Sequence, residues 1–140
     1  MKKMILLALI LPVLSFAQEK IEYENGKMHF LLMDEKGTIY NEKPFASSVS
    51  ITYESFFKSY DLLLVTEQGF STMKLSYLSE ARKNRARYKD LNSSKEATFI
   101  LQDDMATKGT LTLVIEDKDV YDGKPLVKCF IIADLSLVKK

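Results

Sequence analysis

The sequence has 140 residues, of which 46% are hydrophobic and 28% charged, and its net charge at pH 7 is +1. This length and apolar fraction fit one globular domain with a buried core, and five Gly and three Pro exclude a collagen-like or low-complexity chain. The near-zero charge gives no reason to expect a nucleic-acid partner, and a single Cys and a single His leave few ways to build a metal site or a nucleophile–base pair.

Residues 1–17 have the three parts of a secretory signal peptide. Lys2 and Lys3 precede an apolar run of 11 residues, and small residues, ending in Ala17, stand at a cleavage site. The run is too short to span a membrane, which takes about 20 residues. We therefore expect cleavage after Ala17, a periplasmic or secreted bacterial protein, one domain over residues 18–140, and no transmembrane segment in the mature chain. Loss of the two lysines changes the net charge from +1 to −1.

Residues 21–30 predict a β-hairpin. Asn25-Gly26 stands between alternating residues, and this dipeptide suits a two-residue type I′ turn because both turn positions need a positive φ. The register places Glu22 opposite His29 on the polar face. We interpret His29 as a partly exposed surface residue, the alternative being a catalytic base or a metal ligand.

The next segments alternate as strands do. Val49, Ile51 and Tyr53 alternate with polar residues, an apolar run follows over 62–66, and alternation returns over 71–77. A connection over 56–61 joins the first two of these predicted strands.

Aromatic residues gather at this connection and on the strands around it. At a corner between strands they can line the mouth of a barrel that holds an apolar ligand. The alternative is that they fill a small core. The candidate ligand-binding residues are Tyr53, Phe56, Phe57, Tyr60 and Tyr77.

Residues 82–89 hold five cations and no acid. As a strand, this segment places Arg85, Arg87 and Lys89 on one face. Such a face could bind lipopolysaccharide phosphates, an acidic glycan or an acidic partner, or it could merely keep an outward strand from pairing with other molecules. A short helix over 79–87 is the one helical possibility. The candidate anion-binding residues are Arg82, Lys83, Arg85, Arg87 and Lys89.

The last third of the chain predicts strands over 97–102, 110–116 and 126–135. Asp117 to Gly123 resembles a calcium loop only superficially, because the later acidic positions of that motif are missing, and we predict a turn and no metal. Cys129 lies in the final apolar run, and we predict a buried thiol without a disulfide partner.

With a short strand near 38–40, these segments make about eight to ten strands, spaced by about 8–12 residues and joined by short connections. They predict a single all-β domain in which an antiparallel meander forms a calycin- or lipocalin-like barrel. A β-sandwich is the alternative, but a Greek key needs a long crossover. The likeness to lipocalins is architectural, because a chain without Trp lacks their Gly-x-Trp signature. The predicted strands are too short for an outer-membrane barrel.

The residues predict no catalytic constellation, because the only His lies in the predicted hairpin and no Gly-x-Ser-x-Gly elbow is present. We expect a protein that is not an enzyme and has no cofactor. The leading hypothesis is an exported envelope β-barrel that binds an apolar or amphiphilic small molecule. The alternative is a structural or interaction domain that docks an acidic partner or envelope component through the basic strand face.

Overall fold

The computed structural model describes residues 20–34, 36–82, 85–92, 98–121 and 124–138; the side chains of Arg82 and of residues 116–125 are not described. The predicted signal peptide and Lys83 therefore lie outside the described residues. In chain order the elements are β1 (Lys20–Met33), β2 (Ile39–Glu54), β3 (Ser59–Thr66), β4 (Gly69–Arg82), β5 (Arg85–Asp90), β6 (Thr98–Asp104), α2 (Met105–Lys108), β7 (Thr110–Tyr121), β8 (Lys124–Ala133) and β9 (Ser136–Leu137).

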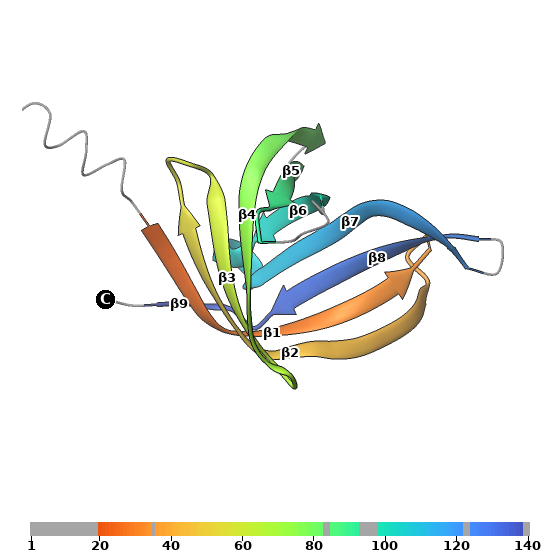
Figure 1. The fold of residues 1–140 in the computed structure, drawn as a ribbon, viewed down its shortest axis with the longest axis horizontal. Helices are drawn as coiled ribbons and strands as arrows, with labels where there is room; N and C mark the ends of the chain where they lie inside the picture. The colour runs from red at the N-terminus through yellow and green to blue at the C-terminus, as the bar shows by residue number, and fades with distance from the viewer. Residues whose placement is uncertain (1–19, 35, 83–84, 93–97, 122–123, 139–140) are drawn as a thin grey trace, which may run out of the picture.

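The strands form an antiparallel meander that closes into a barrel (Figure 1). Each strand from β1 to β8 pairs with the next, and β8 returns to pair with β1. The short strand β9 adds to the first half of β1, where Leu137 lies opposite Tyr23. The predicted all-β meander barrel is confirmed, and the sandwich alternative is excluded.

The predicted hairpin over 21–30 is wrong, because these residues lie within the single strand β1. Asn25 does adopt the positive φ of 65° that a turn would need, but the pairing register with β2 shifts on both sides of Gly26. The dipeptide therefore forms a β-bulge that bends the strand without reversing it. The reversal comes at residues 34–38, where the Asp34 carboxylate accepts hydrogen bonds from the N–H groups of Lys36 and Thr38.

Two other local predictions also change. The possible helix over 79–87 is excluded, since these residues belong to β4 and β5 wherever they are described. The short strand near 38–40 is the start of β2, which runs 16 residues.

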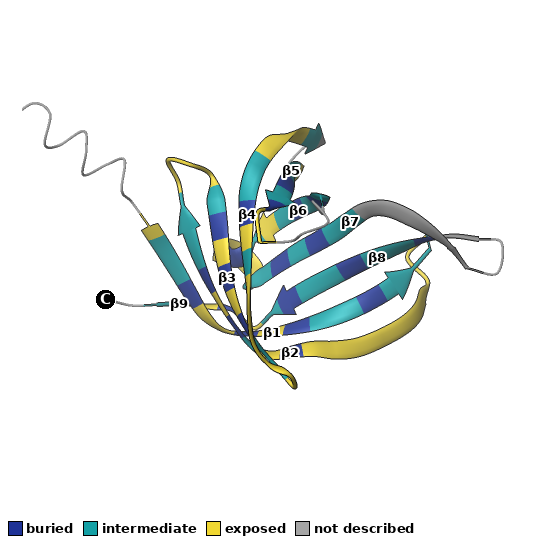
Figure 2. Ribbon diagram, viewed as in Figure 1, coloured by how far each residue is buried: buried dark blue, intermediate teal, exposed yellow. Residues whose placement is uncertain are grey.

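The core follows from alternation along the strands. In β3, Leu62 and Leu64 are buried while Leu63 between them is exposed, because successive side chains point to opposite faces. Figure 2 shows the same alternation as dark bands across the strands. Fully buried residues such as Leu113 and Ile132 complete the barrel interior.

The up-and-down order gives the barrel two different ends. One end holds the β2–β3 turn, the end of β4 and α2; we call it the tyrosine end, after the side chains that fill it (Tyr23, Tyr53, Tyr60, Tyr77 and Tyr88). The other holds the β1–β2 and β3–β4 turns; we call it the phenylalanine end, after Phe30, Phe45 and Phe130.

A close backbone approach seals the tyrosine end. The Leu135 N–H donates a 3.0 Å hydrogen bond to the carbonyl of Gly109, which ends α2 with a φ of +66°. The Leu135 side chain packs over Gly26, where a Cβ would lie only 2.6 Å from its Cδ2 atom. The bulge in β1 thus needs Gly for space, since Gly26 itself has no positive φ.

Candidate functional site

Four tyrosine rings form a continuous chain across the tyrosine end. The ring centroids of Tyr53 and Tyr60 lie 4.7 Å apart, those of Tyr60 and Tyr88 lie 5.3 Å apart, and those of Tyr88 and Tyr77 lie 5.7 Å apart. The last two contacts are edge-to-face, the geometry that aromatic quadrupoles favour. The chain joins strands β2 to β5 across the interior of the barrel.

Asp103 supplies the polar partner that this cluster needs. The Tyr60 hydroxyl donates a 2.7 Å hydrogen bond to Asp103 Oδ2, and Asp103 Oδ1 accepts one of 2.9 Å from the Met105 N–H. Burial, followed by the charge of Asp103 and this hydrogen bond, raises the pKa of Tyr60 well above its usual range. Burial is also the main reason why the pKa of Tyr88 is raised to about 12. The phenols therefore stay neutral and closely packed at ordinary pH.

The predicted ligand-binding residues separate into two groups. Tyr60 is buried, and Tyr53 and Tyr77 are half-buried beside it, so the structure brings these three together. Phe56 and Phe57 lie instead at the β2–β3 turn, 63% and 64% exposed. These two rings contact each other edge-to-face with a centroid distance of 4.9 Å.

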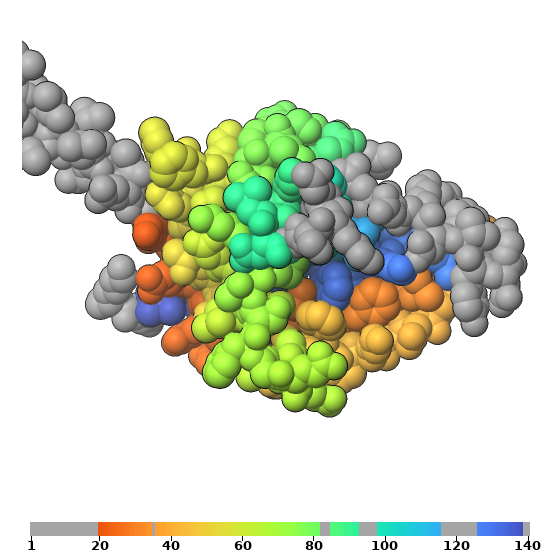
Figure 3. All heavy atoms as spheres, viewed as in Figure 1, coloured from red at the N-terminus to blue at the C-terminus, as the bar shows by residue number. Residues whose placement is uncertain are grey.

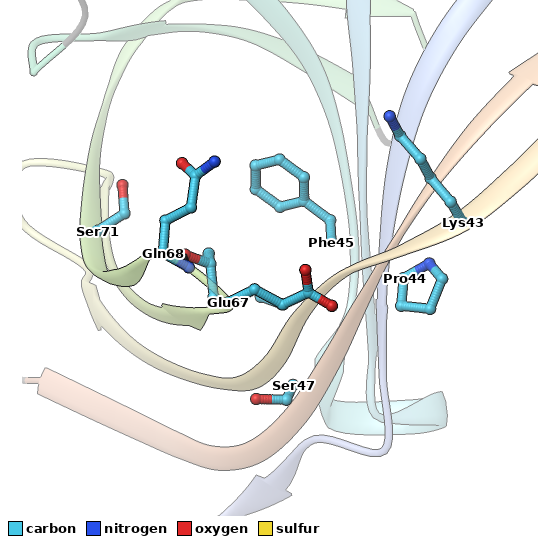
Figure 4. Close-up of a pocket in the computed structure, with 9 residues that line it drawn as sticks. Lys43, Pro44, Phe45, Ser47, Glu67, Gln68 and Ser71 are labelled. Atoms are coloured by element: carbon cyan, nitrogen blue, oxygen red, sulfur yellow. Dashed lines mark hydrogen bonds between the residues drawn. The ribbon is translucent and has the colours of Figure 1, made fainter.

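A pocket of about 570 Å³ opens at the phenylalanine end, where β2 passes the β3–β4 turn (Figure 4). Phe45 points from β2 toward Gln68 on that turn. Around the ring the walls mix polar and apolar groups and are open to solvent. The lining residues are Lys43, Pro44, Phe45, Ala46, Ser47, Thr66, Glu67, Gln68 and Ser71.

A second β-bulge turns Phe45 into this position. Met28 pairs with Ala46 and His29 pairs with Pro44, so Phe45 is the extra residue in β2. Bulges redirect side chains, and Pro44 has no N–H to continue the ladder. The ring packs edge-to-face on Phe130, with centroids 5.0 Å apart.

Two further groups lie behind the Phe45 ring. Phe30 packs on Phe130, with centroids 5.4 Å apart, and Lys43 holds its Nζ 5.6 Å from the Phe30 ring centroid. Phe45 is nevertheless 41% exposed, so it presents apolar surface to the pocket while its position is fixed. The pocket thus offers one apolar wall, one cation and several hydrogen-bonding groups.

Sequence reasoning missed this pocket because it forms where β2 passes the β3–β4 turn, and no contact between these two segments was predicted. The support of Phe45 by Phe130 was missed too, because the prediction of a hairpin over 21–30 removed the β1–β8 pairing that places Phe30 opposite Phe130. Pro44 was the available signal for the bulge at Phe45.

The predicted basic face lies on the outer surface of β5. Tyr88 and Asp90 are buried, whereas Arg85 is exposed and Arg87 half-buried on the opposite side of the strand. Arg85 Nε donates a hydrogen bond to Gln102 Oε1 at 3.2 Å, and the Arg87 guanidinium donates one to the Glu80 carbonyl at 3.3 Å. Lys89 follows on the same face, opposite Ser76 and Thr98 on the adjoining strands. Arg82 ends β4, and its side chain, like all of Lys83, lies outside the described residues.

The two remaining side chains that could react, His29 and Cys129, lie in surroundings that suit a structural role. His29 Nδ1 lies 3.7 Å from Glu42 Oε1, so its acidic neighbour is on β2 and not at the predicted Glu22. Cys129 is a buried free thiol, and burial raises its pKa. Across the part of the chain that the structure describes, no three His, Cys, Asp or Glu side chains gather as metal ligands would.

Comparison with known proteins does not identify a family for this chain. No protein-family model matches the sequence, and no curated protein matches it either. Among the described residues, no helix has the length and apolar character to cross a membrane.

Proposed function

We propose that this protein is an exported small-molecule binding module and that the pocket at the phenylalanine end is its binding site. The observation that carries the proposal is Phe45, which a bulge turns into the pocket and Phe130 holds in place, yet which remains substantially open to solvent. A fixed, partly exposed aromatic ring in a hollow of this size suits an apolar ligand.

The mixed polar and apolar walls favour an amphiphilic ligand. An apolar group would lie on Phe45, whereas a polar group would meet Glu67 and Gln68 on the β3–β4 turn and Lys43 on β2. The tyrosine end offers no comparable opening, because its rings pack on one another and Tyr60 is bonded to Asp103. We propose binding without chemical conversion, and export rests on the signal-peptide pattern of residues 1–17.

Fluorescent probe titration tests the site. N-phenyl-1-naphthylamine brightens in apolar surroundings, so the purified protein should enhance its emission saturably. Phe45→Ser should weaken probe binding about tenfold, equivalent to about 1.4 kcal/mol. Phe56→Ser removes an exposed Phe from the opposite end and is the matched control. Equal binding by both variants would contradict the assignment of the site.

Native mass spectrometry tests the biological ligand. Protein expressed with its own leader and collected from the cell envelope should carry an added mass that denaturing extraction removes. A bare mass in every envelope preparation would oppose a resident ligand.

The second candidate function is docking of an acidic partner through the outer face of β5. The alternation of buried Tyr88 and Asp90 with outward Arg85 and Arg87 supports it. Replacing Arg85, Arg87 and Lys89 together by Ser should lower retention on an anionic resin and its salt dependence. Unchanged, salt-independent retention would remove this alternative.

A further inference from the structure

The β2–β3 turn carries an apolar tip that the core does not use. All four residues from Ser55 to Lys58 are exposed, and the rings of Phe56 and Phe57 contact each other. Figure 1 shows the turn standing clear of the barrel at the tyrosine end. Two neighbouring Phe residues on a projecting turn leave apolar surface in water without gaining packing.

A lysine is fixed directly beside this tip. Lys58 has a φ of +48°, and its Nζ lies 4.7 Å from the centroid of the Tyr77 ring on β4. This cation–π contact keeps the ammonium group at the base of the turn. Leu78, the next residue on β4, is also exposed and enlarges the apolar surface beside the turn.

The neighbouring strand adds further cations at the same end. Arg87 on β5 pairs with Ser79, one residue beyond Leu78, and Arg85 pairs with Arg82 at the end of β4. Figure 3 shows the β2–β3 turn, in yellow, and the end of β4, in green, along one edge of the molecule. Acids also lie at this end. Glu54 on β2 and Glu80 on β4 lie outside the turn itself, and Asp103 on β6 is held by the Tyr60 hydroxyl.

We propose that this surface, which we call the tip surface (Phe56, Phe57, Lys58, Leu78, Arg85 and Arg87), docks on an anionic lipid bilayer. Its shape favours a bilayer over a protein, because a stable protein interface buries about 800 Å² on each partner, whereas a bilayer interface accepts a narrow aromatic projection. Aromatic rings enter at the headgroup level while Lys and Arg beside them attract anionic lipids. Docking at the tyrosine end leaves the phenylalanine end facing the aqueous phase.

Single-tryptophan variants report the depth of each end, because the chain has no Trp of its own. Phe57→Trp places the reporter on the tip, and Phe70→Trp places it at another highly exposed position, 80% exposed, on the first residues of β4 at the opposite end. Each variant is expressed with its leader, collected after export, and mixed with vesicles of phosphatidylglycerol and phosphatidylethanolamine. We expect a blue shift and quenching by brominated lipid for Phe57→Trp only. Equal responses at both positions, or no response at Phe57→Trp, would overturn the proposal.

Co-sedimentation gives an independent measure of affinity. Phe56→Ser combined with Phe57→Ser should reduce partition into the anionic vesicles at least about tenfold, while Phe70→Ser should leave it unchanged. All three positions are exposed, so we expect these variants to fold normally. Phosphatidylcholine vesicles should bind more weakly than anionic ones. Partition that ignores lipid charge, or that survives the double replacement, would overturn the proposal, and the absence of any partition would leave a protein partner as the occupant.

Discussion

The two ends of the barrel use different aromatic residues for different purposes. At the tyrosine end, rings packed in a chain surround a hydroxyl that donates to Asp103, and the end is sealed by Leu135 over Gly26. At the phenylalanine end, Phe45 packs on Phe130 but still faces an open pocket.

The difference follows from the chemistry of the side chains. A buried phenol must find a hydrogen-bond partner, so Tyr60 and Asp103 specify one closed arrangement. A Phe ring has no such requirement and can exchange water for a ligand without leaving a polar group unpaired. We therefore assign closure to the tyrosine end and propose that recognition belongs to the phenylalanine end.

Alkaline pH should have the largest effect and should act on the tyrosine end. The folded-state pKa values of Tyr60 and Tyr88 are raised above the unfolded value of about 10, that of Tyr88 to about 12. The folded protein therefore binds these protons more tightly than the unfolded chain does. The stability that this difference contributes is fully present below pH 10 and falls as pH rises toward 12. Urea unfolding midpoints at several pH values, with tyrosinate absorbance followed at 295 nm, check this. If all the tyrosines ionised at pH 10 without loss of stability, the tyrosine end would not be closed around Tyr60 and Tyr88.

Tyr60→Phe should cost about 1.5–3 kcal/mol in the free energy of unfolding at neutral pH, the range for a hydrogen bond to a charged group. Tyr53→Phe is the matched control, since it removes the same hydroxyl from an adjoining half-buried ring. Chemical denaturation measures both. A loss for Tyr60→Phe no larger than the control's would mean that Asp103 does not hold the closed end together.

Gly26→Ala should cost about 1–3 kcal/mol, because the new methyl group would meet Leu135 and Ile132 at 2.6 and 2.9 Å. Combining it with Leu135→Ala makes space for the methyl group. The double variant should therefore lose less stability than the sum of the two single changes. If the stability losses of the two single variants simply added in the double variant, Leu135 would not be the side chain for which the bulge needs Gly26.

Phe45→Ala should have the smallest effect on stability, below about 1 kcal/mol, because Phe45 is already 41% exposed and lies outside the core. The same change should weaken probe binding about tenfold, as for Phe45→Ser. A large stability loss would place Phe45 in the core and remove the contrast between the two ends.

The sequence predicts the class and topology of this fold because alternation and short connections are local properties. Val49 and Ile51 point inward as their spacing indicates, and Arg85 and Arg87 share the outer face of β5. This face was predictable for the same reason, since the alternation over 85–89 lies within the single strand β5.

Features that depend on pairing between distant strands escaped prediction. Asn25-Gly26 is compatible with a turn or a bulge, and only the β1–β8 pairing and the approach of Leu135 decide for the bulge. Phe45 faces the pocket only because of the second bulge. The aromatic cluster around residue 56 divides likewise, since Tyr60 continues into β3 while Phe56 and Phe57 remain at the turn.

Photocrosslinking with a fatty acid that carries a benzophenone group tests the division between the ends most directly. After irradiation, peptide mapping should find the label on residues 43–47 of β2 and 66–71 around the β3–β4 turn, which line the pocket. Competition by unlabelled fatty acid should remove this label. Label concentrated instead on residues 53–60 or 77–88, at the tyrosine end, would contradict the assignment of recognition to the phenylalanine end.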